Sequence, residues 1–345
     1  MKIGNYIMRK LATIRRISDI QPIPNADAIE VATVDGWQVV IKKGEFQVGN
    51  LAIYLEIDSW VPNTIAPFLS KTKEPRVYQG VPGERLRTVK LRGQVSQGLL
   101  LSVRILPPAR VLEEGDDVSE ELNINKWEME IPAQLRGTVK GSFPSFIPKT
   151  DQERIQNLVH ELEQWKGSNE LWEITEKLDG SSMTVYVNQG YDGVCSRNLD
   201  LKQDDNNSFW KIAIQERIHD RIREVFGPRN IALQGELIGP GIQGNKYNLQ
   251  ELKFYLFDIF DIDRQVYISA KERHELCFHM VLTHVPVMTV RSLDKDVTVA
   301  SLLKLAEGPS FLNLTVEKEG YVYKNANNPS MSFKTISNAF LLGEK

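Results

Sequence analysis

The sequence has little cysteine, no long apolar run and no large excess of one charge. Only two cysteines, Cys195 and Cys277, occur in 345 residues, which excludes a disulfide framework and favours a reducing compartment such as the cytoplasm or nucleus. No apolar run approaches the roughly 18 residues that a membrane-spanning helix needs, so we expect no membrane partner. The formal net charge is −3, and any nucleic-acid site must therefore be a local basic patch.

The usual nucleotide-binding motifs are absent or incomplete. Residues 239–244 match G-x-G-x-x-G literally, but that fingerprint requires a helix directly after it, because the helix N-terminus binds the pyrophosphate. Residues 245–249 and then a predicted strand follow instead, so we predict a loop. Asn245 also stands where a P-loop would have lysine, which excludes that motif.

A zinc site is not indicated either. Four residues have a composition that loosely resembles a set of zinc ligands: His274, Cys277, His279 and His284. Their spacing fits no zinc finger, and the sequence has no C-x-x-C. We interpret them as packing residues of a helix and a strand.

The length of 345 residues is sufficient for two domains, each with its own core. From Leu11 to about Val103 the pattern is one of short strands, and alternating apolar residues flank the turn Asp35-Gly36, which predicts a hairpin. Many short strands with such close turns predict a small closed barrel, assigned here to residues 1–140. The basic N-terminus faintly resembles a transit peptide, but we interpret it as leading into the first strand.

A basic stretch lies within this first domain. Seven lysines and arginines are accompanied by only two acids, Glu74 and Glu84. The basic residues are Lys71, Lys73, Arg76, Arg85, Arg87, Lys90 and Arg92. A solvated face is the plain interpretation of such a run, whereas on a small barrel it is also suited to follow nucleic-acid phosphates.

Glycines and prolines in residues 141–149 predict a linker to a second domain, residues 150–345. Thr150 and Glu153 match a capping box, which predicts that a helix begins at Thr150. Another helix is predicted from Phe209 to the stop signal Gly227-Pro228. Because strands are predicted among these helices, the expected fold class is α+β.

The segment Lys177-Leu178-Asp179-Gly180 is the centre of the predicted chemistry. An apolar run ends at Lys177, and Asp179-Gly180 is predicted to turn the chain as a hairpin into a second run. A neutral lysine at pH 7 costs roughly 4–5 kcal/mol, because its ordinary pKa is about 10.4. A nucleophilic lysine therefore needs desolvation, neighbouring cations or a metal, and attack on phosphorus also needs cations around the phosphates.

Other residues supply those requirements. Glu236 and Glu319 each stand next to glycine in an apolar strand, and Asp179 is a third acid; carboxylate oxygens suit ions of the magnesium type. An acid on an edge strand is the plain alternative for each glutamate. Lys334 is a cation in a strand-like run, and Phe257 is an aromatic residue that can stack on a base, although aromatic residues in strands more often belong to the core.

These segments occur in the order of motifs I, Ia, III, IIIa, IV and V of the covalent nucleotidyltransferases, which include polynucleotide ligases and mRNA capping enzymes. They are Lys177-Leu178-Asp179-Gly180, Ser196-Arg197-Asn198, Gly235-Glu236-Leu237, Phe257-Asp258, Glu319-Gly320-Tyr321-Val322 and Phe333-Lys334. Residues 235–243 resemble the RNA ligase 2 branch. Residues 25–59 resemble the N-terminal OB domain of RNA ligases of the Deinococcus and Naegleria type. The resemblance implies an OB-type β-barrel followed by an antiparallel-sheet nucleotidyltransferase domain.

The resemblance also implies roles for the acids and the nucleophile. Lys177 would form a lysyl-AMP adduct with ATP. Glu236 and Glu319, helped by Asp179, would hold the water shell of Mg²⁺ or Mn²⁺.

Further residues would contact the nucleotide. Glu176 would contact the adenine, on which Phe257 would stack. Lys334 would contact the α-phosphate, and Arg197 the ribose or the polynucleotide end. Arg154, expected on the helix that starts at Thr150, would orient the outgoing pyrophosphate.

One position departs from the RNA ligase 2 pattern. That branch has a second lysine two positions after the first in motif V, and this chain has Ile336 there. Either the register differs or another residue, such as Lys324, makes that phosphate contact. The sequence stops at Lys345, which leaves no room for the C-terminal OB domain and motif VI of DNA ligases and capping enzymes and counts against both.

The implied activity is ATP-dependent RNA ligation by a monomer that joins 3′-OH and 5′-phosphate ends in RNA or in a nicked RNA-containing duplex. It would proceed through lysyl-AMP and a 5′-adenylylated polynucleotide. Two alternatives stay open. A capping-type guanylyltransferase would use GTP at the same lysine, and a non-catalytic OB-domain RNA-binding protein would not depend on Lys177.

Overall fold

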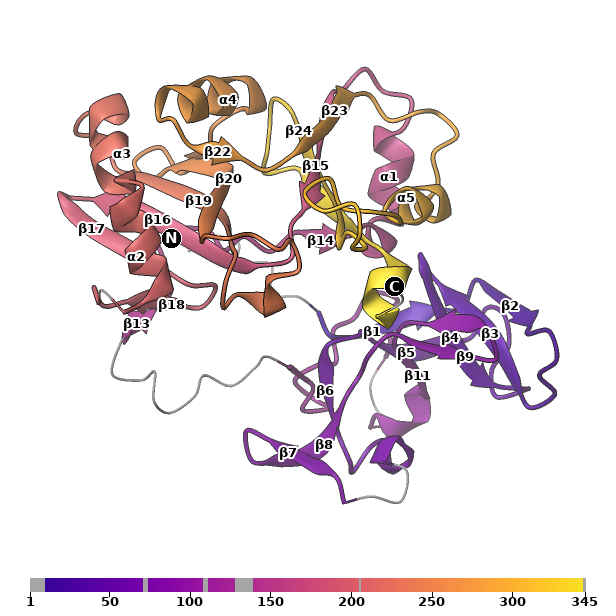
Figure 1. The fold of residues 1–345 in the computed structure, drawn as a ribbon. Coiled ribbons are helices and arrows are strands. Elements are labelled where there is room, and N and C mark those ends of the chain that lie inside the picture. Colours follow the sequence, from indigo (N-terminus) through magenta and orange to yellow (C-terminus); the bar gives the residue numbers. More distant parts are fainter. Residues whose placement is uncertain (1–9, 71–73, 108–110, 128–138, 205, 344–345) are drawn as a thin grey trace. The chain divides into compact units, whose positions relative to one another are not determined.

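The computed structural model describes residues 10–70, 74–107, 111–127, 139–204 and 206–343, which fall into two compact units, Met1–Glu130 and Ile131–Lys345 (Figure 1). The predicted domain limits at residues 140 and 150 stay a prediction. No helix in the described ranges is both long and apolar enough to cross a membrane.

The first unit consists of short antiparallel strands in four small sheets. Their orders are β1-β5-β11, β2-β3-β4, β12-β6-β8-β7 and β10-β9. The strands are β1 Ala12–Arg16, β2 Asp19–Pro22, β3 Ile29–Val34, β4 Trp37–Lys42, β5 Leu51–Leu55, β6 Ser59–Pro62, β7 Arg76–Tyr78, β8 Val81–Arg85, β9 Val89–Leu91, β10 Gln94–Ser96, β11 Leu99–Ser102 and β12 Asn125–Lys126. The hairpin predicted at Asp35-Gly36 is confirmed by the pairing of Val34 with Trp37.

The core of the first unit consists of apolar side chains that alternate along its strands. Ala12 and Ile14 on β1, and Ile53 and Leu55 on the central strand β5, are fully buried. Successive residues of a strand face opposite sides. In β4 every second residue, starting at Trp37, is therefore buried, while Gln38 and Lys42 on the outer face are exposed. Apolar burial of this kind is the main stabilising contribution in a small β-unit.

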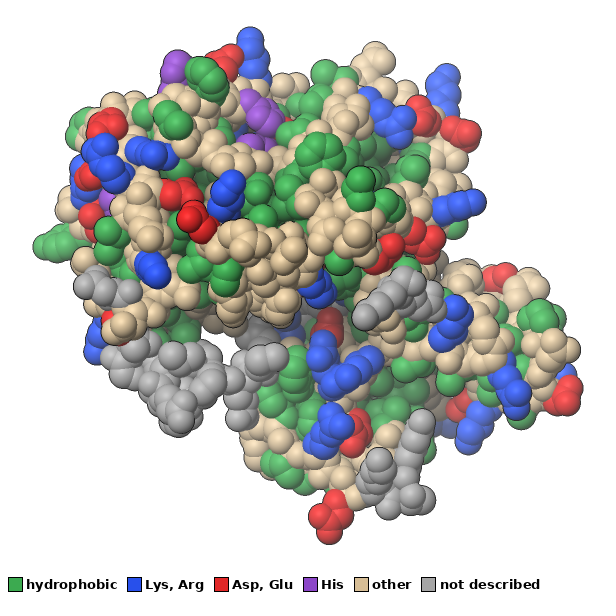
Figure 2. Space-filling model, viewed as in Figure 1, with side chains coloured by type: hydrophobic (Ala, Val, Ile, Leu, Met, Phe, Trp, Pro, Cys, Tyr) green, Lys and Arg blue, Asp and Glu red, His purple; other side chains and the backbone are tan. Residues whose placement is uncertain are grey.

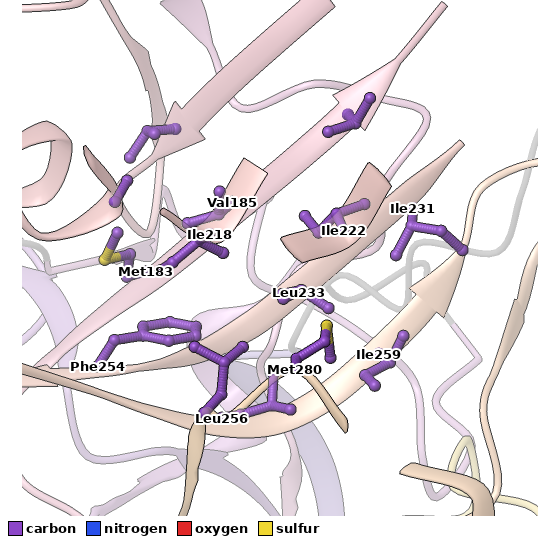
Figure 3. Packing of buried hydrophobic residues seen from close by; sticks show 14 of the residues in the cluster. Met183, Val185, Ile218, Ile222, Ile231, Leu233, Phe254, Leu256, Ile259 and Met280 are labelled. Atoms are coloured by element: carbon purple, nitrogen blue, oxygen red, sulfur yellow. The ribbon is translucent and has the colours of Figure 1, made fainter. Parts of the chain in front are cut away.

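The second unit contains an eight-stranded sheet. Its order is β13-β18-β17-β16-β19-β20-β21, and β22 pairs with β20 in parallel. The strands are β13 Val139–Ser142, β16 Ser181–Asn188, β17 Tyr191–Cys195, β18 Leu199–Leu201, β19 Ile231–Ile238, β20 Lys253–Asp261, β21 Val266–Tyr267 and β22 Thr283–His284. Helices α2 Ser208–Gln215, α3 Ile218–Phe226 and α4 Ala270–His279 cover it (Figure 1), and Met183, Leu233 and Leu256 lie in the shared core (Figure 3).

A five-stranded sheet forms the other part of this unit. Its order is β14-β25-β24-β15-β23. The strands are β14 Glu153–Arg154, β15 Trp172–Lys177, β23 Val287–Arg291, β24 Gly320–Asn325 and β25 Ser332–Ile336, and the helices are α1 Val159–Trp165, α5 Val299–Leu305 and α6 Asn338–Leu342. Trp172, Tyr323 and Phe333 form its buried centre. Sheets with few helices confirm the α+β class.

The helix predicted to begin at Thr150 is wrong. Glu153 and Arg154 form strand β14, and the helix α1 begins only at Val159, with Leu158 as a cap that makes no side-chain hydrogen bond. The Thr150 hydroxyl lies 2.9 Å from that of Ser182, and the Glu153 carboxylate accepts from the Arg154 backbone N–H. Tertiary pairing of Arg154 with β25 therefore overrides the local capping pattern.

Two further predictions need correction. The single helix predicted from Phe209 is two helices, because Arg217 adopts a left-handed conformation between α2 and α3. The hairpin predicted at Asp179-Gly180 does not form. Strand β15, which ends at Lys177, belongs to the five-stranded sheet, and β16 belongs to the eight-stranded sheet. The turn therefore passes the chain from one sheet to the other.

A buried arginine connects these two sheets. Arg273 of α4 is fully buried; it forms an ion pair with Glu173 of β15 and lies 3.6 Å from Asp258 of β20. Asp258 also accepts a hydrogen bond of 2.7 Å from Lys324 of β24. Two buried carboxylates thus face two buried cations, which satisfies the requirement that buried charges be paired.

We expect Glu173→Gln to destabilise the protein by about 3 kcal/mol at pH 7. Burial raises the pKa of Glu173, but His274 and Arg273 outweigh it and lower that pKa to about 2. The folded-state pKa is below the unfolded value, so this stabilisation is present above pH 4.5 and is lost as the pH falls towards 2. The difference between the two pKa values converts to a free energy of unfolding at about 1.36 kcal/mol per pKa unit. Urea unfolding at pH 7 and pH 3 measures it. Equal loss at both pH values would contradict this account.

Candidate active site

Strand pairing brings Lys177 and Glu319 together. Lys177 is the last residue of β15 and pairs with Gly320, the first residue of β24. Glu319 directly precedes Gly320, and its carboxylate lies 2.7 Å from the Lys177 ammonium nitrogen. A Cβ on Gly320 would lie 2.0 Å from the carbonyl oxygen of Thr335, so the close approach of β24 and β25 beside this ion pair requires glycine.

Glu236 reaches the same place from the other sheet. It lies on β19 opposite Ser182 of β16, and its carboxylate accepts a hydrogen bond of 3.1 Å from the backbone N–H of Gly180. A Cβ on Gly180 would lie 2.4 Å from the Leu237 carbonyl oxygen. The Asp-Gly pair is therefore needed for a tight crossing between sheets, and that crossing positions Lys177 beside Glu236.

Asp179 is held by two consecutive residues of the loop that follows β19. Its backbone N–H donates to the Tyr247 hydroxyl at 2.7 Å, and its carboxylate forms an ion pair with Lys246. Tyr247 is itself buried against Leu178 and Tyr255. As predicted, residues 239–249 form a loop with only a short 3₁₀ turn and no following α-helix.

Three carboxylates thus surround one nucleophile candidate. Burial lowers the pKa of Lys177, but the carboxylates of Glu319, Glu236 and Asp179 outweigh it, and the net pKa is raised. Burial, only partly offset by Lys177, raises the pKa of Glu236 to about 8. Shifted pKa values of this kind, caused by burial and neighbouring charges, are typical of functional sites.

Two more predicted residues lie next to this group. Glu176, which precedes Lys177, is buried, and its carboxylate accepts hydrogen bonds from the Ser310 hydroxyl at 2.5 Å and the Phe311 backbone N–H at 2.8 Å. Burial raises the pKa of Glu176, although these hydrogen bonds oppose the rise. Phe257 packs with Leu178 in one apolar cluster, and the Lys324 ammonium lies 4.9 Å from its ring centre.

The remaining predicted residues lie on neighbouring strands or at the surface. Lys334 of β25 and Arg154 of β14 are register partners, so both stand two strands or more from Lys177 in the same sheet. Arg197 is half exposed and forms an ion pair of 2.7 Å with Asp151. Lys324, considered as a substitute for the missing motif V lysine, is buried and bonded to Asp258 and to the Phe257 carbonyl.

Sequence reasoning missed Lys246, Tyr247 and Ser310. Lys246 is the only lysine in the glycine-rich loop after motif III. Its position in this predicted loop was the available signal that it contacts the site. Ser310 gave no signal, because it reaches Glu176 across 134 positions of sequence.

Two of the residues considered as zinc ligands, His274 and His284, lie close together. In the described part of the chain, one group of possible ligands converges, and it consists of Glu173, His274 and His284. The Arg273 guanidinium donates to the His284 ring at 3.2 Å and pairs with Glu173, so a cation already contacts two members of this group. Cys277 instead donates to the Leu282 carbonyl.

The chain is similar to known RNA ligases over nearly its whole length. The OB-fold domain family matches residues 11–103 and the RNA ligase family matches residues 170–336. Among solved structures, a Naegleria gruberi RNA ligase mutant in the apo state is 45% identical and covers 96% of this chain and 97% of that chain, with a TM-score of 0.88.

Two further structures of that enzyme agree. A mutant with ATP and Mn is 45% identical and covers 96% of this chain and 98% of that chain, with a TM-score of 0.87. The enzyme with PPi is 46% identical, with the same coverage and a TM-score of 0.87. No curated protein matches the chain. Because 45% identity extends over 96% of the chain and the RNA ligase match includes Lys177, Glu236 and Glu319, the chain belongs to the RNA ligase family.

Proposed function

We propose that the protein is an ATP-dependent ligase that joins a 3′-OH end to a 5′-phosphate end of RNA, most readily at a nick in a duplex. The observation that carries the proposal is the placement of the Lys177 ammonium 2.7 Å from Glu319, with Glu236 and Asp179 also acting on its charge. The Naegleria gruberi enzyme structures with ATP and Mn and with PPi support the same nucleotide and leaving group here.

In the first step, the Lys177 amine attacks the α-phosphorus of ATP. One proton leaves the ammonium group beforehand to give this amine; the P–N bond then forms, the bond to pyrophosphate breaks, and the nitrogen loses a second proton to solvent. In the second step, an oxygen of the RNA 5′-phosphate attacks the same phosphorus and releases the lysine. In the third step, the 3′-OH attacks the 5′-phosphorus and AMP leaves. Nucleophilic catalysis of this kind divides one difficult displacement into easier ones.

The acids fit a divalent cation through its water shell. Glu319, Glu236 and Asp179 all act on the charge of Lys177, so an ion bound beside this lysine would meet three carboxylates. Mg²⁺ keeps several of its waters when bound in proteins, and carboxylates can hold it through contacts to those waters. When bound, the ion would supply charge stabilisation at the α-phosphate and favour the neutral amine of Lys177.

Other side chains would bind and orient the nucleotide. Phe257 would offer its ring to the adenine, while Glu176 would accept from the base. Lys334 and Arg154, adjacent in β25 and β14, would neutralise the phosphates, and Arg197 would contact the ribose or the RNA end. The roles of Phe257 and Glu176 are supported by their chemistry and by their packing beside Leu178 and Lys177, and those of Lys334, Arg154 and Arg197 by the chemistry of their side chains.

The OB unit would bind the RNA backbone. Arg76, Arg87, Lys90 and Arg92 are exposed, and lysine and arginine side chains gather on the visible face of this unit (Figure 2). Lys71 and Lys73 lie outside the described residues. A local basic patch on a chain with a net charge of −3 suits phosphate contacts, whose strength falls with salt.

Incubation with labelled ATP or GTP and Mn²⁺ tests the proposal. We expect label from ATP and none from GTP, and then sealing of nicked duplexes when RNA and DNA are varied on each side of the nick. Label from GTP would establish the capping-type alternative. Absence of label from both, with unchanged RNA binding by a Lys177→Ala variant, would establish the non-catalytic alternative.

A further inference from the structure

The Lys246 ammonium lies between a carboxylate and an aromatic ring. It forms an ion pair with Asp179, and it lies 4.3 Å from the centre of the Phe340 ring in α6. The Lys246 backbone carbonyl accepts a hydrogen bond of 3.1 Å from the Asn313 side chain. Two segments therefore contact the Lys246 side chain, and a third fixes its backbone.

The two members of this ion pair differ in exposure. The Asp179 side chain is 18% exposed, whereas the Lys246 side chain is 41% exposed. If the ammonium left Asp179, it would be rehydrated at little cost and would keep the face of Phe340, since a cation over an aromatic ring is attracted to it. The carboxylate would stay in place, because its backbone N–H is bonded to Tyr247. The structure thus combines a fixed acid with a releasable cation.

We propose that Lys246 is a positioning residue that occupies the Asp179 carboxylate in the metal-free protein and is displaced when a divalent cation arrives. This inference rests on the proposed function. Through Lys246, the loop after β19 would help to set the affinity of the site for the metal. Lys246 and the metal compete for one carboxylate, so Lys246 holds Asp179 in its working position while weakening metal binding. The positive charge of Lys246 would also reduce the repulsion among Asp179, Glu236 and Glu319 before the ion binds.

Titration of the protein with Mn²⁺, with free Mn²⁺ followed by electron paramagnetic resonance and without ATP, tests this competition. An ion pair of this exposure changes an equilibrium constant by about two- to fivefold. We therefore expect Lys246→Met to lower the Kd for Mn²⁺ by that factor. The same substitution in an Asp179→Asn background should leave the Kd unchanged. Thermal unfolding of all four proteins checks that each is folded.

Three results would overturn the inference. They are an unchanged or weaker affinity in Lys246→Met, an equal gain in both backgrounds, which would indicate only a long-range charge effect, and no Mn²⁺ binding by either the wild type or Lys246→Met. Failure of the proposed function would give a different result from failure of this inference. Lys177 would then take no label from ATP, while the Mn²⁺ affinities of the four proteins would still change as expected.

Discussion

Replacing Lys177 by methionine is expected to abolish formation of the enzyme–AMP adduct and to lower ATP-dependent sealing by at least about a thousandfold. Methionine matches the lysine stem in length but has no amine to attack phosphorus. A substrate that already carries AMP on its 5′-phosphate contains the bond that Lys177 would otherwise help to make. We therefore expect the Lys177→Met variant to seal such a pre-adenylylated end in the absence of ATP.

A matched control is available on the same unit. Lys253, at the start of β20, is exposed, and its charge acts on the carboxylate of Glu216. Lys253→Met should keep wild-type adduct formation and sealing. Label retained in Lys177→Met would show that another residue is the nucleophile.

Replacing Glu236 by glutamine is expected to lower adduct formation by about a hundredfold or more while the protein stays folded. The amide keeps an oxygen that can accept from the Gly180 N–H, which Glu236 now does at 3.1 Å. Glutamine cannot ionise, whereas a bound divalent cation would favour the ionised form of Glu236 that holds its water shell; loss of one group that stabilises charge in the transition state commonly costs this much. Single-turnover labelling at saturating ATP and Mn²⁺ measures the effect.

The control for this second variant is an acid outside the site. Glu251 is exposed between the loop and β20, so Glu251→Gln should react at the wild-type rate. Wild-type labelling by Glu236→Gln would remove Glu236 from the site. Loss of labelling together with a large loss of thermal stability would instead assign it a structural role.

The grouping of Lys177 with Glu236 and Glu319 could be expected from the sequence for a physical reason. Lys177, Glu236 and Glu319 each stand beside a glycine or an Asp-Gly pair in an apolar strand, and close backbone approach at such glycines explains why the pattern is visible in sequence. Gly180 and Gly320 would each bring a Cβ into contact with a backbone oxygen. At these positions the residue that would carry the chemistry stands next to the glycine that the backbone geometry requires, so one short segment shows both.

Long-range pairing decided the features that the sequence did not predict. Thr150 and Glu153 form a good capping pattern, yet β14 pairs with β25, about 180 residues later in the chain. Asp179-Gly180 has the composition of a hairpin turn, yet the strands it joins belong to different sheets. Local signals describe what a segment can form alone, and only the choice of partner strand decides between the options.

The contacts of Glu176, Asp179 and Glu173 illustrate the same limit. Their partners Ser310, Lys246 and Arg273 come from loops or a helix at separations of 134, 67 and 100 residues. None of these partners stands in a motif. A charge in a loop or on a helix is a solvated residue by default, and only the fold shows that Arg273 is fully buried and that Lys246 lies against Asp179.

The most direct test of the central claim is to locate the AMP group on the protein. After reaction with ATP and Mn²⁺, peptide mass spectrometry under conditions that preserve the acid-labile P–N bond should find a single added AMP, on Lys177. AMP attached to any other residue, or a folded protein that carries none, would contradict the account.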